Sequence, residues 1–284
     1  MESMRDVLPL IGLGVGSVAL LVLLNLFELR RARRREERAR EQARIEAEAM
    51  GELPDPTAYA RSFLERNRRP ACFLLPGPAL QPEDVRATYI GAVRVLGEGE
   101  QWPQCDGVAM VGLAQFNLLE APYVPEDLQG LALVSVFMVL GSPFRVEVRG
   151  YKSLEELVGA TGAPPVPEGW RPCGAQARLG DDFPSFAPGP PYEGLAVQEV
   201  PAAWEVALLD AVQAVADELP DDLRWGPKLG GWPAPVQDPL ERPLGLQIGY
   251  ENGARINLVD TGCVYAWRSM KDGQEVWETD FQFY

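Results

Sequence analysis

Residues 7–27 read VLPLIGLGVGSVALLVLLNLF, a stretch of twenty-one residues without a charged side chain. As an α-helix this stretch would be about 31 Å long, which matches the hydrocarbon core of a bilayer. A helix in a soluble core would carry polar residues at helical spacing, whereas here only Ser17 and Asn25 interrupt the apolar run. The stretch therefore predicts a transmembrane helix over residues 7–29, in contact with the lipid bilayer through Val7 to Phe27.

The flanks of this stretch predict its orientation. Eight arginines follow it between Arg30 and Arg44, whereas residues 1–6 contain one arginine and two acidic residues. Arginine clusters beside a membrane span stay on the cytoplasmic side. We therefore expect an external N-terminus at 1–6, a basic juxtamembrane helix or linker at 30–52, and a cytoplasmic globular domain at 53–284. A single-pass protein of the inner membrane follows. A cleaved signal peptide would need a basic start and a shorter apolar stretch.

Charge is distributed unevenly between this N-terminal segment and the rest of the chain. The formal net charge is −15. Residues 1–50 are close to neutral, so the acidic excess belongs to the globular part. Such a domain is repelled by phosphates, and we expect no nucleic acid partner. A homodimer is possible because Gly12 and Gly16 have the spacing of a helix-packing motif, although ordinary glycine usage explains the pair as well.

Histidine is absent, and the four cysteines are far apart in the sequence. The missing histidine excludes Ser-His-Asp and Cys-His catalysis and every histidine-ligated metal site. Cysteines without a C-x-x-C pair argue against a zinc ribbon. We therefore expect no cofactor and no metal, and any enzyme built from this chain would have to use carboxylates, Lys, Tyr, Cys or Thr.

The globular part alternates strand-like runs with few helical ones. Apolar or alternating runs predict strands at residues 86–96, 108–118, 131–140, 144–149, 244–250, 256–259, 263–268 and 275–283. A periodic apolar stripe predicts a helix from Trp204 to Leu219, and the capping box at Ser153 predicts a short helix that ends near Gly159. The proline-rich residues 163–194 are interpreted as a connection between lobes at about 53–162 and 195–284. The predicted fold class is α+β, with a mixed or antiparallel sheet.

Two segments resemble each other, which predicts an internal duplication. Trp102-Pro precedes Gln115 in an apolar strand, and Trp232-Pro precedes Gln247 in another. A glutamine buried in a strand must find hydrogen-bond partners. It either holds a neighbouring loop in place, which is how buried polar groups usually behave, or contacts a ligand.

The ordered motifs resemble the YwqG-like family, a bacterial domain family of unknown function. The second half carries Lys228-Leu-Gly-Gly-Trp-Pro, Val236-Gln-Asp-Pro, Leu244-Gly-Leu-Gln-Ile and Val259-Asp-Thr-Gly-Cys-Val-Tyr. The first half carries Gln101-Trp-Pro, Leu113-Ala-Gln-Phe-Asn-Leu and Leu128-Gln-Gly-Leu. The resemblance covers about residues 86–140 and 225–284. It implies an α+β domain with an internal duplication and carries no established reaction. The first half departs from it at Gly91-Ala-Val-Arg, where the family has G-G-x-P.

Two function classes follow. The first is a membrane-anchored binding module that docks an unknown protein partner or neutralises a toxin, and the second is a carboxylate-based hydrolase that uses Asp260 with Asp238 or Asp106. The absence of histidine favours the first, and the chain is not assigned to an enzyme class. Candidate ligand contacts are Trp102, Gln115, Trp232, Gln237, Gln247 and Asp260. Residues expected to shape turns are Gly230, Gly231, Pro233 and Gly262.

Overall fold

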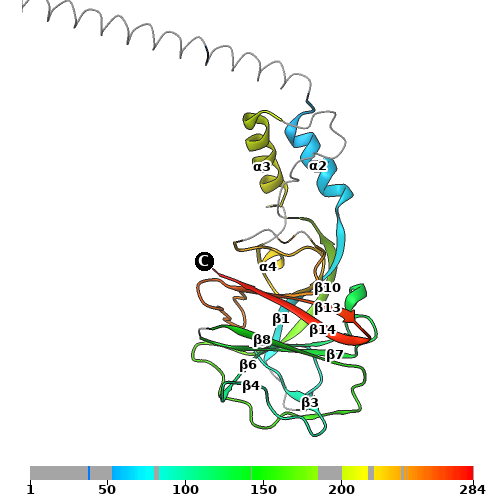
Figure 1. Ribbon diagram of the computed structural model, residues 1–284, viewed down its shortest axis with the longest axis vertical. Coiled ribbons are helices and arrows are strands. Elements are labelled where there is room, and N and C mark those ends of the chain that lie inside the picture. The colour runs from blue at the N-terminus through cyan, green and yellow to red at the C-terminus, as the bar shows by residue number, and fades with distance from the viewer. Residues whose placement is uncertain are drawn as a thin grey trace, which may run out of the picture. The chain divides into compact units, whose positions relative to one another are not determined.

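A single antiparallel sheet dominates the computed structural model, which describes residues 38, 53–79, 83–141, 143–184, 200–216, 221–237, 240 and 242–283. The sheet has ten strands in the order β14-β13-β12-β11-β1-β10-β2-β6-β7-β8 (Figure 1). In chain order these are β1 (Arg69–Ala79), β2 (Tyr89–Ile90), β6 (Val111–Asn117), β7 (Leu133–Val139), β8 (Arg145–Tyr151), β10 (Cys173–Asp182), β11 (Lys228–Gly230), β12 (Leu246–Ile248), β13 (Cys263–Lys271) and β14 (Gln274–Gln282).

The remaining elements are short. Two-stranded ladders join β3 (Val95–Gly97) to β9 (Leu157–Gly159) and β4 (Gln104–Cys105) to β5 (Val108–Ala109). The helices are α2 (Pro56–Arg66), α3 (Ala202–Ala216), the single-turn α4 (Asp221–Arg224) and the 3₁₀ helix η1 (Glu126–Leu128). The predicted helix from Trp204 is thus present as α3.

The chain forms two compact units. One comprises residues 1–55 and 190–205, and the other comprises residues 56–189 and 206–284. In the first unit, the indole Nε1 of Trp204 donates a hydrogen bond to the backbone oxygen of Pro54 at 2.9 Å. The second unit contains the whole sheet.

The sheet is nearly closed, because its two edge strands approach each other. Figure 1 shows β14 beside β8. The ring of Phe144, which precedes β8, lies 4.9 Å from the ring of Phe281 in β14. Buried side chains inside the sheet form the main core, which includes Leu113, Val136 and Val264. The edges that an open sheet would expose are therefore largely covered by each other.

The predicted α+β fold class is wrong, because the described residues are mainly β-structure. Of the predicted helix start at Ser153, one capping bond is present: the Ser153 hydroxyl oxygen accepts a hydrogen bond from the backbone N–H of Glu155 at 3.1 Å. The helix does not continue. Leu157 is instead buried beside Val95 and Leu133 and begins β9, so tertiary packing overrides the local helix signal.

The proline-rich connection expected at residues 163–194 contains a central strand. Strand β10 pairs with β1 on one side and with β2 on the other. Most of its side chains from Gln176 to Asp181 are exposed, so the segment lacks the apolar pattern that would have marked it as a strand. Strand β1 was missed because of its prolines. Pro76 and Pro78 lie beyond Phe73, the last residue of β1 that pairs with β11. Their missing N–H groups therefore destabilise the sheet less than they would at a position paired on both sides.

The membrane prediction also needs correction. Within the described residues, none of the helices is long and apolar enough to cross a membrane. The longest, α3, has 15 residues and would be about 22 Å long, and it carries Glu205 and Asp210. The predicted span at 7–29 and, except for Arg38, the basic segment at 30–52 lie outside the described residues. The structure therefore does not support a single-pass inner-membrane protein, and that localisation is withdrawn.

The two halves of the sheet repeat one hydrogen-bonding pattern. Tyr89 of β2 faces Gln115 of β6, and Lys228 of β11 faces Gln247 of β12. A glycine with positive φ, Gly91 or Gly230, comes two residues after the first member of each pair. Its backbone N–H donates to the carbonyl oxygen two residues before the paired glutamine. The counterpart of Gly230-Gly-Trp-Pro is therefore Gly91-Ala-Val-Arg, and the Trp102-Pro turn lies outside this pattern.

Each of these glutamines connects loops. Gln115 accepts hydrogen bonds from the backbone N–H groups of Arg94 and Val95 and donates to two carbonyl oxygens of the segment before β2. Gln247 accepts from the N–H of Ala234 and donates to the carbonyl oxygens of Arg224 and Gly226 at 3.1 Å. Both side chains are fully buried. Every polar atom of these two amides is thus used: the oxygen holds the segment that follows β2 or β11, and the nitrogen holds the segment that precedes it.

We expect Gln115→Leu and Gln247→Leu each to lower the free energy of unfolding by about 1–3 kcal/mol, because each leaves buried loop groups without partners. The exposed Gln274, at the start of β14, provides the control, and Gln274→Leu should stay within about 0.5 kcal/mol of the parent. Chemical denaturation measures all three. Losses at Gln115 and Gln247 no larger than at Gln274 would show that these bonds do not hold the loops.

Candidate functional site

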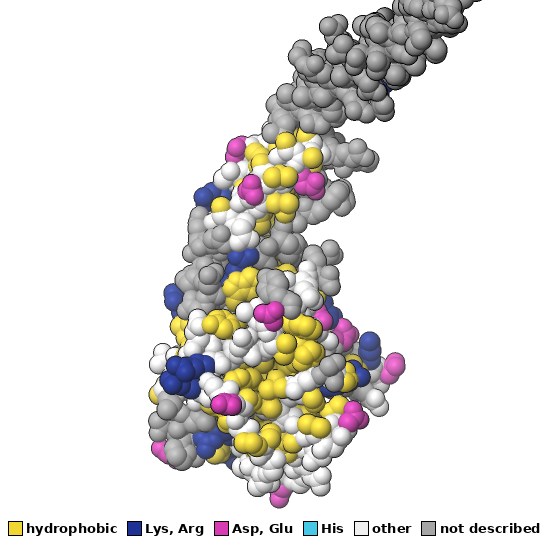
Figure 2. Space-filling model, turned by 90° about the vertical axis from the view of Figure 1, so that its left-hand side faces the viewer, with side chains coloured by type: hydrophobic (Ala, Val, Ile, Leu, Met, Phe, Trp, Pro, Cys, Tyr) yellow, Lys and Arg dark blue, Asp and Glu magenta, His cyan; other side chains and the backbone are white. Residues whose placement is uncertain are grey.

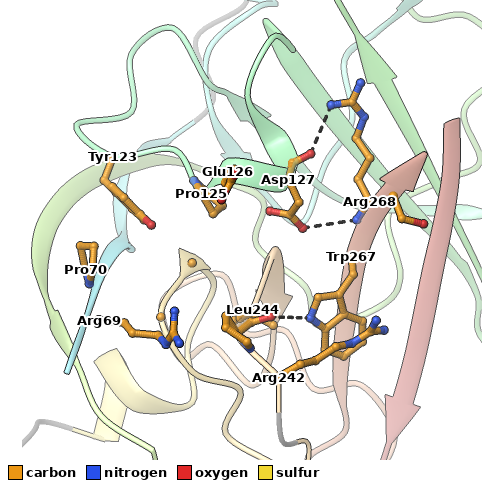
Figure 3. Close-up of a pocket in the computed structure, with 14 residues that line it drawn as sticks. Arg69, Pro70, Tyr123, Pro125, Glu126, Asp127, Arg242, Leu244, Trp267 and Arg268 are labelled. Carbon is orange, nitrogen blue, oxygen red and sulfur yellow. Dashed lines mark hydrogen bonds between the residues drawn. The ribbon is translucent and has the colours of Figure 1, made fainter. Parts of the chain in front are cut away.

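A cleft of about 560 Å³ is lined by residues from both halves of the chain (Figure 3). It lies between the start of β1, the loop and 3₁₀ helix at residues 123–127, the turn after β11, the segment 242–244 and strand β13. Its lining includes Arg69, Pro70, Tyr123, Pro125, Glu126, Asp127, Gly230, Gly231, Arg242, Pro243, Leu244, Trp267, Arg268 and Ser269. Its volume is within the usual range for small-molecule sites.

One part of the lining is the glycine turn after β11. Gly230 and Gly231 have φ angles of +71° and +74°, a region that favours glycine. A Cβ at Gly230 would lie 2.6 Å from the ring carbon Cε1 of Tyr123, and one at Gly231 would collide with the Asp182 carboxylate. The chain bends at Gly231. The two glycines allow Tyr123 to approach on one side and Asp182 on the other.

A buried ion pair holds this turn. Lys228 Nζ lies 2.8 Å from Asp182 Oδ2, and the two side chains are 1% and 2% exposed. The same carboxylate oxygen accepts a hydrogen bond from the backbone N–H of Trp232 at 2.8 Å. Oδ1 accepts from the N–H of Phe183. The end of β10 is therefore connected to both sides of the glycine turn.

An arginine stacked on a tryptophan forms one wall of the cleft. The guanidinium carbon of Arg242 lies 3.9 Å from the ring centre of Trp267, and its Nη1 is 2.9 Å from Glu278. The indole Nε1 of Trp267 donates to the backbone oxygen of Pro243 at 2.8 Å. Both planar groups are thus fixed, and the charge of Arg242 is compensated.

Asp127 lies in another part of the lining. Its Oδ2 accepts a hydrogen bond from the backbone N–H of Arg268 at 3.3 Å, and the Arg268 guanidinium is paired with Glu275 at 3.0 Å. Burial raises the pKa of the Asp127 carboxyl above its usual value, and nearby backbone N–H groups and Arg268 offset part of that effect. Because the pKa of Asp127 is raised in the folded protein, part of the folding stability is lost as the pH rises through that pKa. The ionised carboxylate therefore destabilises the fold at neutral pH.

Arg69 and Tyr123 are two polar groups of the cleft with spare hydrogen-bonding capacity. Figure 3 shows the two side chains on the same side of the cleft. The Arg69 guanidinium lies 4.9 Å from the ring centre of Trp232 and has no ion-pair or hydrogen-bond partner among the described residues. Burial raises the pKa of Tyr123, and the negative charges of Asp127 and Glu126 add to this against the opposing effect of Arg69. The hydroxyl is therefore protonated and can donate.

The predicted ligand contacts lie outside this cleft. Trp102 is buried, donates through Nε1 to the backbone oxygen of Met110 and packs edge-on against Phe137. Trp232 is 7% exposed and donates through Nε1 to the backbone oxygen of Asn67, so it supports the turn from behind. Gln237 is exposed, and its backbone N–H donates to Gln282 at 3.0 Å. Of the turn residues, Gly230 and Gly231 line the cleft.

Asp260 lies in an exposed left-handed turn. Val259, Asp260 and Thr261 have φ angles of +39°, +40° and +59°, and the N–H of Gly262 closes the turn on the carbonyl oxygen of Leu258. Of the acidic partners considered for a hydrolase, Asp238 is outside the described residues and Asp106 is exposed in the turn between β4 and β5. Asp106 and Asp260 do not line the cleft.

Thiol chemistry is also disfavoured at the buried Cys72 and Cys263. Burial raises the pKa of Cys72 to about 11 and that of Cys263 to about 12, so both are protonated at neutral pH. All four cysteines are free. No group of three or more Cys, Asp or Glu residues in the described part of the chain is arranged to hold a metal ion.

The cleft residues were missed from the sequence because they come from separate segments between Arg69 and Ser269. Each is an ordinary residue in its own segment, and only the fold brings them together. One signal was available. Glu126 and Asp127 directly precede the Leu128-Gln-Gly-Leu motif, which contributed to the family resemblance.

Comparisons with known proteins give no assignment. Neither a protein-family model nor a curated protein matches the chain. The resemblance to the YwqG-like family therefore remains a prediction that rests on the motifs alone.

We expect Gly231→Ala to be much more destabilising than Gly273→Ala. Both glycines have similar φ angles, +74° and +76°, but a Cβ at Gly273 meets nothing within 4 Å. Gly273→Ala therefore measures the backbone strain alone, about 1 kcal/mol. Gly231→Ala adds the collision with the buried Asp182 and should cost at least about 2 kcal/mol more. Equal losses of unfolding free energy would mean that Asp182 does not constrain the turn.

Proposed function

We propose that this protein is a binding module whose ligand occupies the cleft between Tyr123, Asp127 and Trp267. The observation that carries this proposal is the pair Arg69 and Tyr123, whose polar groups lie at the cleft without partners in the described residues. Hydrogen-bond donors that a fold leaves unpaired at a concave surface are available to a ligand. Arg69, Glu126 and Arg242 are exposed, so the cleft can be reached from solvent.

The energetics of Asp127 support the same function. Its ionised carboxylate is disfavoured by burial, and a neutral side chain of similar shape would avoid this cost. Stability is often sacrificed at sites where function needs a particular group. A carboxylate kept in a cleft at a cost to stability therefore favours a role in binding.

The surface favours a compact ligand over an extended polyanion. On the face in Figure 2, basic and acidic side chains are scattered around hydrophobic ones. Together with the acidic excess of the chain, this arrangement lacks the continuous basic surface that nucleic acid binding requires. A small molecule, or the end of a protein partner's chain, is the size of ligand that the cleft can hold.

A ligand screen by NMR tests this function. We expect at least one compound from a set of amino acids, short peptides, carboxylic acids, amines and phosphates to shift the backbone amide signals of Gly230 and Gly231. Arg69→Glu should weaken that binding at least tenfold by reversing the charge at the cleft. Arg68→Glu is the matched control, because Arg68 is adjacent in sequence but pairs with Glu65 and Asp181 outside the cleft.

Arg68→Glu should change the affinity less than twofold. The proposal fails if none of these compounds perturbs the cleft amides, or if Arg68→Glu weakens binding as much as Arg69→Glu does.

A further inference from the structure

The cleft has a free positive charge in one place and free negative charges in another. Figure 3 shows Arg69 and Tyr123 toward one end of the cleft, and Asp127 further along the side from which Tyr123 comes. The guanidinium of Arg69 has no acidic partner among the described residues, and the protonated hydroxyl of Tyr123 can donate to the same ligand group. A planar guanidinium beside a hydroxyl donor suits a carboxylate, because both of its oxygens accept hydrogen bonds.

The negative charges are suited to an ammonium group. Asp127 accepts hydrogen bonds from backbone N–H groups, and its nearest guanidinium, that of Arg268, is paired with Glu275. Glu126 is adjacent and exposed. A ligand cation near Asp127 would lower the cost of ionising this partly buried carboxyl.

The other arginines of the cleft do not change this balance. Arg242 is paired with Glu278 and Arg268 with Glu275, at 2.9 and 3.0 Å. Arg69 is therefore the one uncompensated cation among the described lining residues. A phosphate or nucleotide with several negative charges would meet one free guanidinium together with Asp127 and Glu126, which repel it.

An apolar wall completes the site. Pro243 and Leu244 lie next to the stacked pair of Arg242 and Trp267. The exposed plane of a guanidinium is a surface on which an aromatic or aliphatic side chain packs well. The hydroxyl of Ser269, also in the lining, is buried and has no hydrogen-bond partner in the described part of the chain.

We propose that the cleft recognises a zwitterionic amino-acid ligand, meaning a free amino acid or a short peptide with an apolar side chain. The carboxylate binds Arg69 and the Tyr123 hydroxyl, the ammonium group binds Asp127, and the side chain packs on the exposed Pro243 and the Arg242–Trp267 pair. This inference rests on the proposed binding function and specifies its ligand class.

Blocked dipeptides test each charge separately. The probes are the dipeptide Ala-Phe, its N-acetylated form, which lacks the ammonium group, and its C-terminal amide, which lacks the carboxylate. Isothermal titration of the full chain should show that each blocked form binds at least tenfold more weakly than Ala-Phe. If either blocked form binds as tightly as Ala-Phe, the zwitterionic ligand class is wrong.

Two variants assign the charges to residues. In Arg69→Ala the free acid and the amide should bind equally, and in Asp127→Asn the free amine and the acetylated form should bind equally. Asp272→Asn, in the exposed turn between β13 and β14, is the control and should keep both preferences. Thermal unfolding verifies that each variant is folded, and Arg69→Lys, which retains the charge, should keep part of the preference for the free acid. Unchanged preferences in Arg69→Ala or Asp127→Asn would overturn the assignment.

The outcome for the ligand class can be distinguished from that for the binding function. If inorganic phosphate, a simple carboxylate or a blocked peptide binds more tightly than Ala-Phe and Arg69→Glu abolishes that binding, the cleft is a binding site but the zwitterion proposal is wrong. If Ala-Phe and all the screened compounds leave the cleft amides unperturbed, both proposals fail.

Discussion

The buried ion pair between Lys228 and Asp182 is the interaction on which the cleft depends. Two opposite charges that are almost completely removed from water cost several kcal/mol each to desolvate, and their attraction offsets this only with good geometry and further hydrogen bonds. Asp182 meets that condition, since its two oxygens also bind the N–H groups of Trp232 and Phe183. The pair connects the end of β10 to the glycine turn after β11, and that turn is part of the cleft.

The comparison of the two halves shows why only the second half has the double-glycine turn that lines the cleft. The position of Lys228 is occupied by Tyr89 in the first half, and the Tyr89 hydroxyl donates to the backbone oxygen of Asp84. The position of Gly231 is occupied by Ala92, which has no positive φ. The shared elements are the glutamine and the first glycine, which build the turn. The charged pair and the second glycine are found only in the second half, and the second glycine leaves the space that Asp182 occupies.

Sequence reasoning was most reliable where a local pattern has one structural solution. Gly230-Gly231 predicted a turn with positive φ angles, and the apolar runs around Leu113 and Val264 predicted buried strands, because these outcomes depend on neighbouring residues. It failed where tertiary contacts decide. Pro76 and Pro78 are tolerated in β1 because they lie beyond the residues of β1 that pair with β11. Leu157 becomes a strand residue because its side chain packs in a buried cluster with Val95 and Leu133.

The candidate site was less predictable than the fold for a related reason. Trp102, Gln115 and Gln247 were singled out because polar or large side chains in apolar strands are conspicuous in a sequence, yet burial assigns them to holding loops and filling the core. Arg69 and Arg242 are indistinguishable in the sequence. Only the structure shows that Arg242 is neutralised by Glu278 and that Arg69 has no acidic partner among the described residues. Which charges remain free is a property of the folded arrangement.

A double-mutant cycle on the ion pair tests the central claim most directly. The unfolding free energies of Lys228→Met, Asp182→Asn and the double variant are measured by denaturation. Each single change should cost about 3–5 kcal/mol because it leaves one buried charge uncompensated, and the double variant should cost at least about 2 kcal/mol less than the sum of the two. Effects that add to within about 0.5 kcal/mol would show that the two residues act independently and that the pair does not hold the turn.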